Sequence, residues 1–572
     1  MNKRENRSVW LEYLCFWLLF LVPVVRLFIW KFFKGAESFE KEDCSSLVIS
    51  AVIFILVMLW SILKTIKKSP IQSTTLIFPL LGFVFCVGLS VFYSIDRAMS
   101  LKAFLVLFSY SLYFLILVDI LDTRQKVLAF IYLLIACGVV VSFIGINEFL
   151  FLANRPTLET DQKLLLLNKS LHYVISHKRI CSLFGWPNVL AAFLIMTVPI
   201  TFALAMFEKL RFNKGVLIFF STVFFLVLLL TYSVAGVLSL MVGGLVVFIL
   251  RFQFKNAPSK TGREKMQILF FVLTAIIFLG FVIYKRDYFA IANTSNPRFD
   301  YLYAVTSLIA EHPWIGSGWN TFQEANRSYI LSERGYSSYA HHSYLQIWAE
   351  SGILAMVFFI SIFVFLFREA HQYLMKNKND TLVFGFLGAI VALLVENLFS
   401  FSFLKPNISF FFWFVLALMV AWINLQGVQW QLVSGIKSIF FVVAIFFFGL
   451  IFLFLSLRVL KGETSYYAGI RFIKKKEYAQ ALSFLEKAKS INPLDSRFSS
   501  MIGQLYYASH KNTKNSLQLQ RAEKEFLRAQ HLTPKMYENY RYLSRIYKDK
   551  GDFKKFKEYH EKSIRLAPYL KI

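Results

Sequence analysis

The chain has 572 residues, of which 57% are apolar and 17% carry a formal charge. Soluble globular proteins are roughly 45–50% apolar and about 25% charged. The composition therefore excludes a disordered chain, a collagen-like chain and an ordinary soluble enzyme, and it indicates a polytopic membrane protein. The net charge is +28, from 62 Lys and Arg against 34 Asp and Glu.

Hydropathy predicts a bundle of membrane-spanning helices. A helix needs roughly 20 mostly apolar residues to cross the hydrocarbon core. The stretches that meet this requirement, thirteen in all, are residues 12–30, 46–63, 74–93, 103–120, 127–149, 183–206, 215–231, 234–250, 267–284, 344–367, 382–404, 408–424 and 437–456. Little more than Tyr232 and Ser233 separates the seventh stretch from the eighth, which predicts a helical hairpin. The expected fold is an all-α bundle of about 12–13 spans followed by a small α-solenoid.

Lys and Arg in the short loops predict the orientation of this bundle, because they favour the cytoplasmic side. The cationic segments are the N-terminus and the loops near 64–68, 124–126, 209–214, 251–265 and 368–378. The first outside loop, with Lys31, Lys34 and Lys41, argues mildly the other way. The two longest loops, 150–182 and 285–343, and everything after residue 456 are then expected outside the cytoplasm.

The composition changes abruptly after Ser456, where Lys, Glu, Gln and Tyr replace the runs of Phe and Leu. We therefore predict a membrane domain at residues 1–456, with a large loop at 285–343, and a separate domain at 457–572. This tail has 25 Lys and Arg against 11 Asp and Glu, or +14, which is half of the chain's excess. Such a basic surface attracts anionic lipid headgroups or an acidic partner.

Small residues recur in the tail at positions where two helices of a hairpin would touch. The first segment has Ala481 and Ala488 at these positions, and the second has Ala522 and Ala529. The third segment departs from the pattern, with Phe556 and Ser563 there. Pro534 and Pro568 are 34 residues apart, which resembles the tetratricopeptide period, with an insertion expected within 511–517. The atypical third segment is what a terminal repeat looks like. A generic amphipathic bundle is the alternative, and either fold provides a binding surface rather than a catalytic centre.

The common catalytic motifs are absent from the sequence. There is no Walker A loop, dinucleotide fingerprint, G-x-S-x-G or H-E-x-x-H motif. There is also no Asp-x-Asp, so we expect no metal ion and no other cofactor. The five cysteines form no C-x-x-C pair. Cys44 and Cys181 both fall outside the cytoplasm in the predicted topology, and only geometry can decide whether they pair.

Unusual polar residues gather in and beside the two long loops. The larger loop contains Asn296-Pro-Arg298-Phe-Asp-Tyr301, His312-Pro-Trp-Ile-Gly316-Ser-Gly318 and, at its end, Ala340-His341-His342-Ser-Tyr-Leu-Gln-Ile-Trp-Ala-Glu350-Ser-Gly352. The smaller loop ends with Lys178-Arg179-Ile-Cys-Ser-Leu-Phe-Gly-Trp-Pro187-Asn188-Val-Leu-Ala191.

The order and spacing of these residues resemble the O-antigen ligase/polymerase superfamily, which are glycan transferases of the bacterial inner membrane. That family carries an Arg, a glycine-containing stretch, then Pro-Asn and Ala before one span, as at 179–191 here. Its large loop carries an Arg, then H-P-x-x-G-x-G, then H-N-x-Y-L-Q followed by Glu and Gly, as at 298–352 here. The resemblance covers roughly residues 75–425 and departs from the family at two positions. His342 stands where Asn is usual, and Val234 stands where the family commonly has Arg.

The resemblance implies a glycan donor linked to undecaprenyl pyrophosphate and a metal-independent, inverting transfer to an acceptor hydroxyl. The leaving pyrophosphate carries about two negative charges, which guanidinium groups can bind bidentately. We expect Arg298 and Arg179 to stabilise this charge, with Lys178 as an auxiliary cation. The acceptor hydroxyl needs a base, and neutral histidine supplies one, so His341 is the candidate.

Three further residues of the motifs are expected to support these groups. His342 would contact the acceptor or neighbour the base, although the two histidines could exchange roles. Glu350 is expected at or near the start of a helix, where a carboxylate is favoured by the dipole, and so in a structural position. Asn188 completes the Pro-Asn pair of the smaller loop.

The main hypothesis is thus a multi-pass O-antigen ligase-type enzyme of the bacterial inner membrane. It would transfer an oligo- or polysaccharide to a lipid A–core sugar on the periplasmic face, and its tail could recruit a protein partner. We expect no nucleic acid. A polysaccharide polymerase and a protein O-oligosaccharyltransferase share this chemistry and stay open. A lipid-linked glycan flippase predicts charges inside the bundle and repeated spans, and a non-catalytic scaffold predicts that loop substitutions cost nothing.

Overall fold

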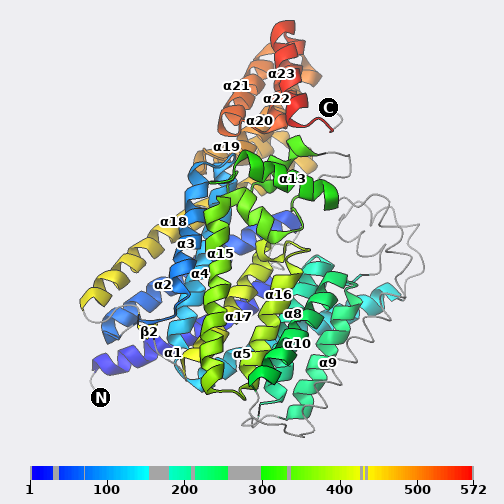
Figure 1. The fold of residues 1–572 in the computed structure, drawn as a ribbon. Helices are drawn as coiled ribbons and strands as arrows, with labels where there is room; N and C mark the ends of the chain where they lie inside the picture. The colour runs from blue at the N-terminus through cyan, green and yellow to red at the C-terminus, as the bar shows by residue number, and fades with distance from the viewer. Residues whose placement is uncertain are drawn as a thin grey trace.

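The computed structural model describes residues 3–29, 38–69, 71–153, 179–207, 213–254, 298–330, 337–425, 430–431 and 436–569. Within these residues the chain is all-helical apart from two-residue strands β1 (Gln72–Ser73) and β2 (Trp430–Gln431), which pair antiparallel. A bundle of long helices carries a smaller group of helices at one end (Figure 1). The all-helical prediction is confirmed.

The bundle contains the helices that the hydropathy predicted. They are α1 (Lys3–Phe28), α2 (Ser38–Lys67), α3 (Ile77–Phe92), α4 (Arg97–Ile120), α5 (Arg124–Ala153), α8 (Pro187–Ala205), α9 (Lys214–Leu230), α10 (Val234–Phe254), α15 (Ser343–Lys376), α16 (Thr381–Glu396), α17 (Pro406–Asn424) and α18 (Ile436–Lys474). Nine helices of the described chain are long and apolar enough to cross a membrane, and α3, α9 and α16 are shorter apolar helices. Together they match twelve of the predicted spans, and the remaining span, 267–284, lies outside the described residues.

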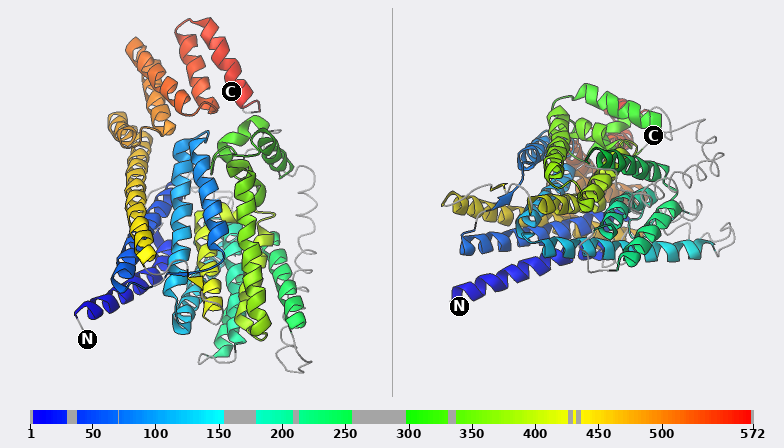
Figure 2. Two further views of the ribbon diagram at one scale, coloured as in Figure 1. Left: turned by 60° about the vertical axis from the view of Figure 1, so that its left-hand side comes forward. Right: turned by 60° about the horizontal axis from the view of Figure 1, so that its bottom comes forward.

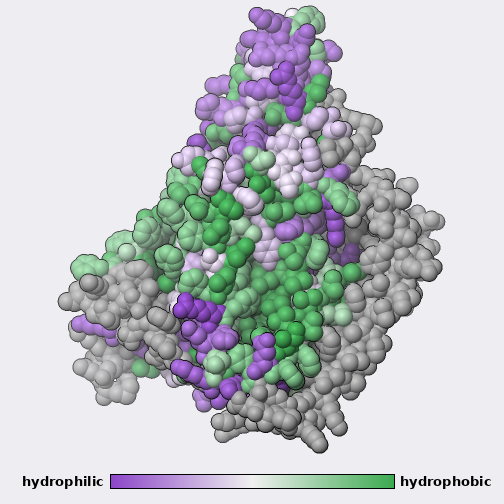
Figure 3. Space-filling model, in the orientation of Figure 1, coloured by the Kyte–Doolittle hydropathy of each residue, from purple (hydrophilic) through white to green (hydrophobic). Residues whose placement is uncertain are grey.

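Helix α17 forms the centre of the bundle. Every residue from Ile408 to Asn424 is buried, as expected for a helix that is apolar on all sides. Helices α4, α5, α8 and α15 all pack against it. On the face that Figure 3 shows, the described surface of the bundle is largely apolar, whereas the tail is mostly hydrophilic. This division agrees with the change in composition after Ser456.

The prediction that residues 215–231 and 234–250 pack as a hairpin needs correction. A tight turn at Thr231–Ser233 does join α9 to α10, with Tyr232 at a φ of 50°. However, α9 packs mainly against α8, and α10 packs mainly against α16. Glycines explain this choice, because a Cβ at Gly243 would lie 2.4 Å from the carbonyl oxygen of Gly388. The two helix backbones can therefore approach closely there.

The predicted span 382–404 is also too long, because α16 ends at Glu396. Asn397 ends the helix by joining a polar network in which its Oδ1 accepts from Ser343 Oγ at 2.6 Å and from the backbone NH of Phe403 at 2.9 Å. The chain then turns into the short helix η3 (Ser402–Leu404). Glu396 therefore lies at a helix end, where it accepts from Ser402 Oγ at 2.9 Å, rather than in the middle of a span.

Three antiparallel helix pairs form the tail. Its helices are the last part of α18, α19 (Tyr478–Ile491), α20 (Ser496–Thr513), α21 (Ser516–Leu532), α22 (Tyr537–Asp549) and α23 (Phe553–Leu566). The small residues Ala481, Ala488, Ala522 and Ala529 are fully buried, as their recurrence predicted. Residues 511–517 surround the turn between α20 and α21. After α18, these two are the longest helices of the tail, so the extra residues lengthen this pair. Figure 2 shows that α18 runs without a break from the bundle into the tail, through the predicted boundary at residue 456.

The tail is docked on the end of the bundle where α13 (Arg298–Glu311) lies (Figure 1). The guanidinium of Arg327, from the short helix η2 (Asn326–Tyr329), forms an ion pair with Glu538 and lies 5.0 Å from the ring centroid of Tyr537. Lys535 Nζ lies 3.0 Å from Glu311 Oε1. The second half of the large loop is thus in direct contact with the tail.

Arg327→Ala and Glu538→Ala are each expected to loosen this contact, because either change removes the same ion pair. The double variant should loosen the contact by less than the sum of the two single-variant effects, and the difference is a coupling energy of about 0.5–3 kcal/mol. Hydrogen–deuterium exchange of α22 in the full-length protein measures the effect. Lys489→Ala, which breaks a pair with Glu525 inside the tail and away from α22, is the control. Strictly additive effects would contradict the contact.

Candidate active site

The imidazole of His341 lies between two aromatic rings at the end of the large loop. It stacks on Tyr301, with 5.3 Å between ring centroids, and meets Phe401 edge-on at 4.8 Å. Its Nδ1 is buried and has no hydrogen-bond partner within the part of the chain that the structure describes. The backbone of His341 has a φ of 55°, so the residue occupies the left-handed region immediately before α15. An aromatic clamp therefore holds an imidazole with an open acceptor nitrogen.

The charge of Arg298 acts on this histidine. Arg298 is the first residue of α13, and Tyr301 follows one helical turn later on the same face. Burial, together with the charge of Arg298, lowers the pKa of the His341 imidazole to about 4. At neutral pH the ring is therefore uncharged and able to accept a proton. The structure thus brings two of the predicted site residues together.

His342 has a different position from His341. It is the N-cap of α15, and its Nδ1 accepts from the backbone NH of Leu345 at 3.3 Å. Asn is usual at this position in the family that the sequence resembles, and it is among the best N-cap residues. Because Nδ1 of His342 accepts the same kind of capping bond, His can replace Asn here. The capping bond directs this imidazole toward the helix backbone, whereas Nδ1 of His341 has no such bond.

Glu350 holds the preceding loop against α15. Its carboxylate accepts from the backbone NH groups of Asn320 at 2.7 Å and Phe322 at 3.0 Å, and from Gln346 Nε2 at 2.9 Å. Glu350 is fully buried in the third turn of α15, two residues before the break at Gly352. The expectation of a place at or near a helix start is therefore wrong. These bonds fix the loop that follows α13.

Glycines allow the same loop to touch the α15 backbone. Gly316 and Gly318 have φ values of 78° and 111°, which favour glycine. A Cβ at Gly316 would lie 2.3 Å from the carbonyl carbon of Glu350. The H-P-x-x-G-x-G motif therefore forms a backbone turn packed on the break in α15, and the large loop is built around Glu350.

Arg179 and Asn188 form a second pair. Nη2 of Arg179 donates to Asn188 Oδ1 at 2.8 Å, and its Nε donates to the carbonyl oxygen of Thr231 at 2.9 Å. Thr231 lies in the turn just before Val234, where the resembling family commonly has Arg. A guanidinium is thus present at this turn, although it comes from another part of the sequence. Lys178 lies outside the described residues.

Both pairs lie at the same end of the bundle, which we call the site end. The backbone NH of Ser343 donates to the carbonyl oxygen of Asn397 at 3.0 Å, so α15 begins where α16 ends. Thr381, at the start of α16, donates to the carbonyl oxygen of Ala203, near the end of α8, at 3.3 Å. Helices α8 and α16 therefore run antiparallel, and Asn188 at the start of α8 faces the same side as His341.

Several groups at the site end were not predicted from the sequence. Tyr301 was part of the large-loop pattern but had no role there, although its spacing from Arg298 was a usable signal. Phe401 had no signal, because it lies in a run of aromatic residues that resembles the end of a span. Cys44 and Cys181 do not form a disulfide, and Cys181 Sγ lies 3.4 Å from Glu148 Oε1. Among the described residues, no three His, Cys, Asp or Glu side chains form a group that could hold a metal ion.

One family model matches part of the chain. Residues 217–360 match the model of the family described as O-Antigen ligase. The matched segment contains Arg298, His341 and Glu350, whereas Arg179 and Asn188 precede it. No curated protein matches the chain. The family match and the apolar helices support a multi-pass membrane protein with a glycosyltransferase-like domain. Over residues 217–360 the chain therefore resembles the O-antigen ligase family.

Proposed function

We propose that this protein transfers a glycan from a lipid-linked pyrophosphate to an acceptor hydroxyl, with His341 as the general base. The observation that carries this proposal is the uncharged imidazole of His341, whose buried Nδ1 has no partner among the described residues, beside the cation of Arg298. A base next to a phosphate-binding cation is what a displacement at a sugar phosphate requires.

In the proposed transfer, His341 takes the proton and the lipid pyrophosphate is the leaving group. The acceptor hydroxyl gives its proton to His341 as its oxygen bonds to the anomeric carbon. The bond from that carbon to the pyrophosphate oxygen breaks, and the lipid pyrophosphate leaves with the electron pair. Attack opposite the leaving group inverts the anomeric centre. A positioned base contributes typically 10²–10⁴-fold to the rate, so roughly this much of the acceleration is assigned to His341.

Arg298 has two effects in this scheme. In the free protein its charge helps to keep His341 uncharged. When a pyrophosphate binds, the negative charges offset that cation and raise the pKa of the neighbouring imidazole, which makes it a stronger base. Arg179 supplies a second guanidinium at the site end, fixed by Asn188 and Thr231. Arg179 can thus replace the cation that is missing at position 234, where the family commonly has Arg and this chain has Val.

The donor in this proposal is undecaprenyl pyrophosphate-linked, and the protein lies in the bacterial inner membrane with its site end toward the periplasm. The cationic loops at the opposite end support this orientation. The tail is proposed as three tetratricopeptide-like repeats. Ligation to a lipid A–core sugar is the favoured reaction, because a docked tail gives an acceptor-side surface that a polymerase acting on its own repeat unit does not require.

The pH profile tests the assignment of the base. Because only the uncharged imidazole accepts a proton, kcat/KM is expected to be flat near neutral pH and to fall as the pH drops through the low pKa of His341, about 4. In Arg298→Gln one cause of that low pKa is removed, so the acid limb should move to higher pH. An acid limb at the same pH in both proteins would contradict the pairing of these residues.

The function itself is tested with purified full-length protein, a lipid pyrophosphate-linked glycan and a panel of acceptors, in the presence of a chelator. We expect a glycosylated acceptor and one lipid pyrophosphate released for each transfer. Elongated lipid-linked chains without acceptor would identify a polymerase, and modified protein would identify a protein transferase. Movement of the donor across vesicles without transfer would contradict an enzyme and support a flippase.

A further inference from the structure

A cavity of about 300 Å³ lies at the site end between the bundle and the tail. Its walls come from α2, α4, the segment after α13, the start of α17 and, from the tail, α18, α20 and Met536. A volume near 300 Å³ is the lower limit of ordinary small-molecule sites. The bundle alone leaves one side of this cavity open, and the tail closes that side. The volume is then large enough for a small-molecule site.

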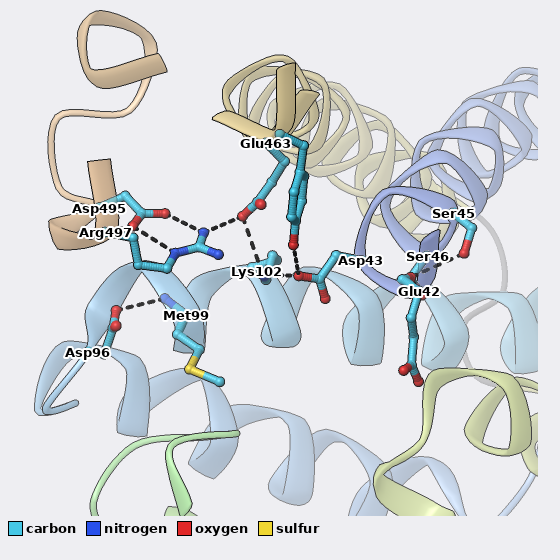
Figure 4. Close-up of polar contacts among 11 residues, drawn as sticks. Glu42, Asp43, Ser45, Ser46, Asp96, Met99, Lys102, Glu463, Asp495 and Arg497 are labelled. Atoms are coloured by element: carbon cyan, nitrogen blue, oxygen red, sulfur yellow. Dashed lines mark hydrogen bonds and ion pairs between the residues drawn. The ribbon is translucent and has the colours of Figure 1, made fainter. Parts of the chain in front are cut away.

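Carboxylates dominate the charged lining. It contains five acidic residues, Glu42, Asp43, Asp96, Glu324 and Glu350, and two cations, Lys102 and Arg497. Both cations are already engaged. Lys102 Nζ lies 2.6 Å from Asp43 Oδ2 and 3.3 Å from Glu463 Oε1, and Arg497 bridges Glu463 and Asp495 (Figure 4). These ion pairs fasten α20 and α18 to the bundle, and they leave the cavity without a cation for an anionic ligand.

One carboxylate in the wall retains an unused acceptor. Asp96 is 4% exposed, and its Oδ1 accepts from the backbone NH of Met99 at 2.9 Å, as an N-cap of α4. Its other oxygen forms no hydrogen bond with the residues that the structure describes, and the side chain lines the cavity. Burial raises the pKa of this carboxyl, but its free oxygen offers an acceptor site, so a ligand group that donates a hydrogen bond fits here.

Aromatic rings form another part of the wall and connect it to His341. Trp319 and Tyr339 line the cavity. The ring of Tyr339 stacks on Phe401 with 4.3 Å between centroids, and Phe401 contacts His341 at 4.8 Å. The rings of Tyr339 and Phe401 thus lie between the cavity and the proposed base.

We propose that this cavity binds the acceptor of the transfer as a neutral sugar, through a hydroxyl group that donates to Asp96. This inference rests on the proposed function. A sugar hydroxyl supplies a donor for the free oxygen of Asp96, and the rings of Trp319 and Tyr339 give flat apolar faces for the sugar ring. A phosphorylated or uronic acid sugar is disfavoured, because the two cations of the lining are already engaged by Asp43, Glu463 and Asp495. The tail then acts as part of the acceptor site.

The test separates binding from transfer. Full-length protein in nanodiscs, without donor, is titrated with neutral methyl hexosides and with the corresponding 6-phosphates and uronates, and binding is followed by saturation-transfer NMR. Ala103→Phe fills the cavity from α4, and Val364→Phe adds the same ring to an exposed face of α15 as a control. Transfer to the same glycosides is then measured with the lipid-linked donor.

We expect the parent and Val364→Phe to bind at least one neutral glycoside, and Ala103→Phe to bind it at least tenfold more weakly. Asp96→Asn, which keeps an N-cap, should weaken binding by a smaller factor. Equal binding of neutral and anionic glycosides, or unchanged binding in Ala103→Phe, would overturn the inference. If binding follows the expected pattern but no variant transfers glycan, the sugar site stands and the proposed function fails.

Discussion

Replacing His341 with alanine is expected to lower kcat by about 10²–10⁴-fold without unfolding the protein. Among the described residues, the imidazole is held by ring contacts with Tyr301 and Phe401, and its buried Nδ1 has no hydrogen-bond partner, so its loss leaves no described partner of that nitrogen unpaired. Its removal takes away the proton acceptor of the transfer. Initial rates with saturating donor and acceptor, together with the thermal unfolding midpoint, measure both parts of this expectation.

His342→Asn is the matched control, because it changes the adjacent histidine and keeps the capping function. Asn accepts the backbone NH of Leu345 at least as well as His does, so α15 should start normally. We expect its rate to stay within a few-fold of the parent. If His342→Asn is inactive and His341→Ala is not, the two histidines have the opposite roles and the geometric assignment is wrong.

Gly352→Ala is expected to destabilise the site end by at least about 3 kcal/mol. Gly352 has φ 82° and ψ 171°, a conformation that is almost restricted to glycine. A Cβ there would lie 1.9 Å from the carbonyl oxygen of Trp314, which is backbone and cannot rotate away. The loop that Glu350 anchors must then shift. Thermal unfolding in detergent and the transfer rate should both fall.

Gly185→Ala separates the two causes of this effect. Gly185 also has a positive φ, 73°, but a Cβ there would meet nothing within 4 Å. Only the conformational cost of about 1–2 kcal/mol then applies. If both alanine variants lose the same stability, the contact between Gly352 and the loop contributes nothing, and the packing described for the H-P-x-x-G-x-G turn is wrong.

The spans could be predicted because each is a local property of the sequence. Twelve apolar stretches coincide with helices, although several of these helices extend beyond the apolar stretch. The errors arose where distant residues decide the structure. Helix α16 stops at Glu396 because Asn397 bonds to Ser343, which lies 54 residues earlier. The preference of α10 for α16 over α9 depends on Gly243 meeting Gly388, and no window of the sequence contains both.

The site follows the same division. The pairing of Arg179 with Asn188 spans nine residues and was contained in one motif. The clamp around His341 needs Tyr301 and Phe401, which come from opposite sides of it in the sequence. The acidic cavity needs α4 and the tail together, and Lys102 and Glu463 are 361 residues apart. Charge counting assigned the tail a basic surface, but it could not show that some of its cations are used for docking.

The most direct test is a single-turnover reaction with excess full-length protein, a lipid pyrophosphate-linked glycan of known anomeric configuration and an acceptor, in a chelating buffer. We expect the parent protein to give a product of inverted configuration and to release lipid pyrophosphate, and His341→Ala to do both about 10²–10⁴-fold more slowly. A product of retained configuration, or equal rates in the two proteins, would contradict direct displacement with His341 as the base.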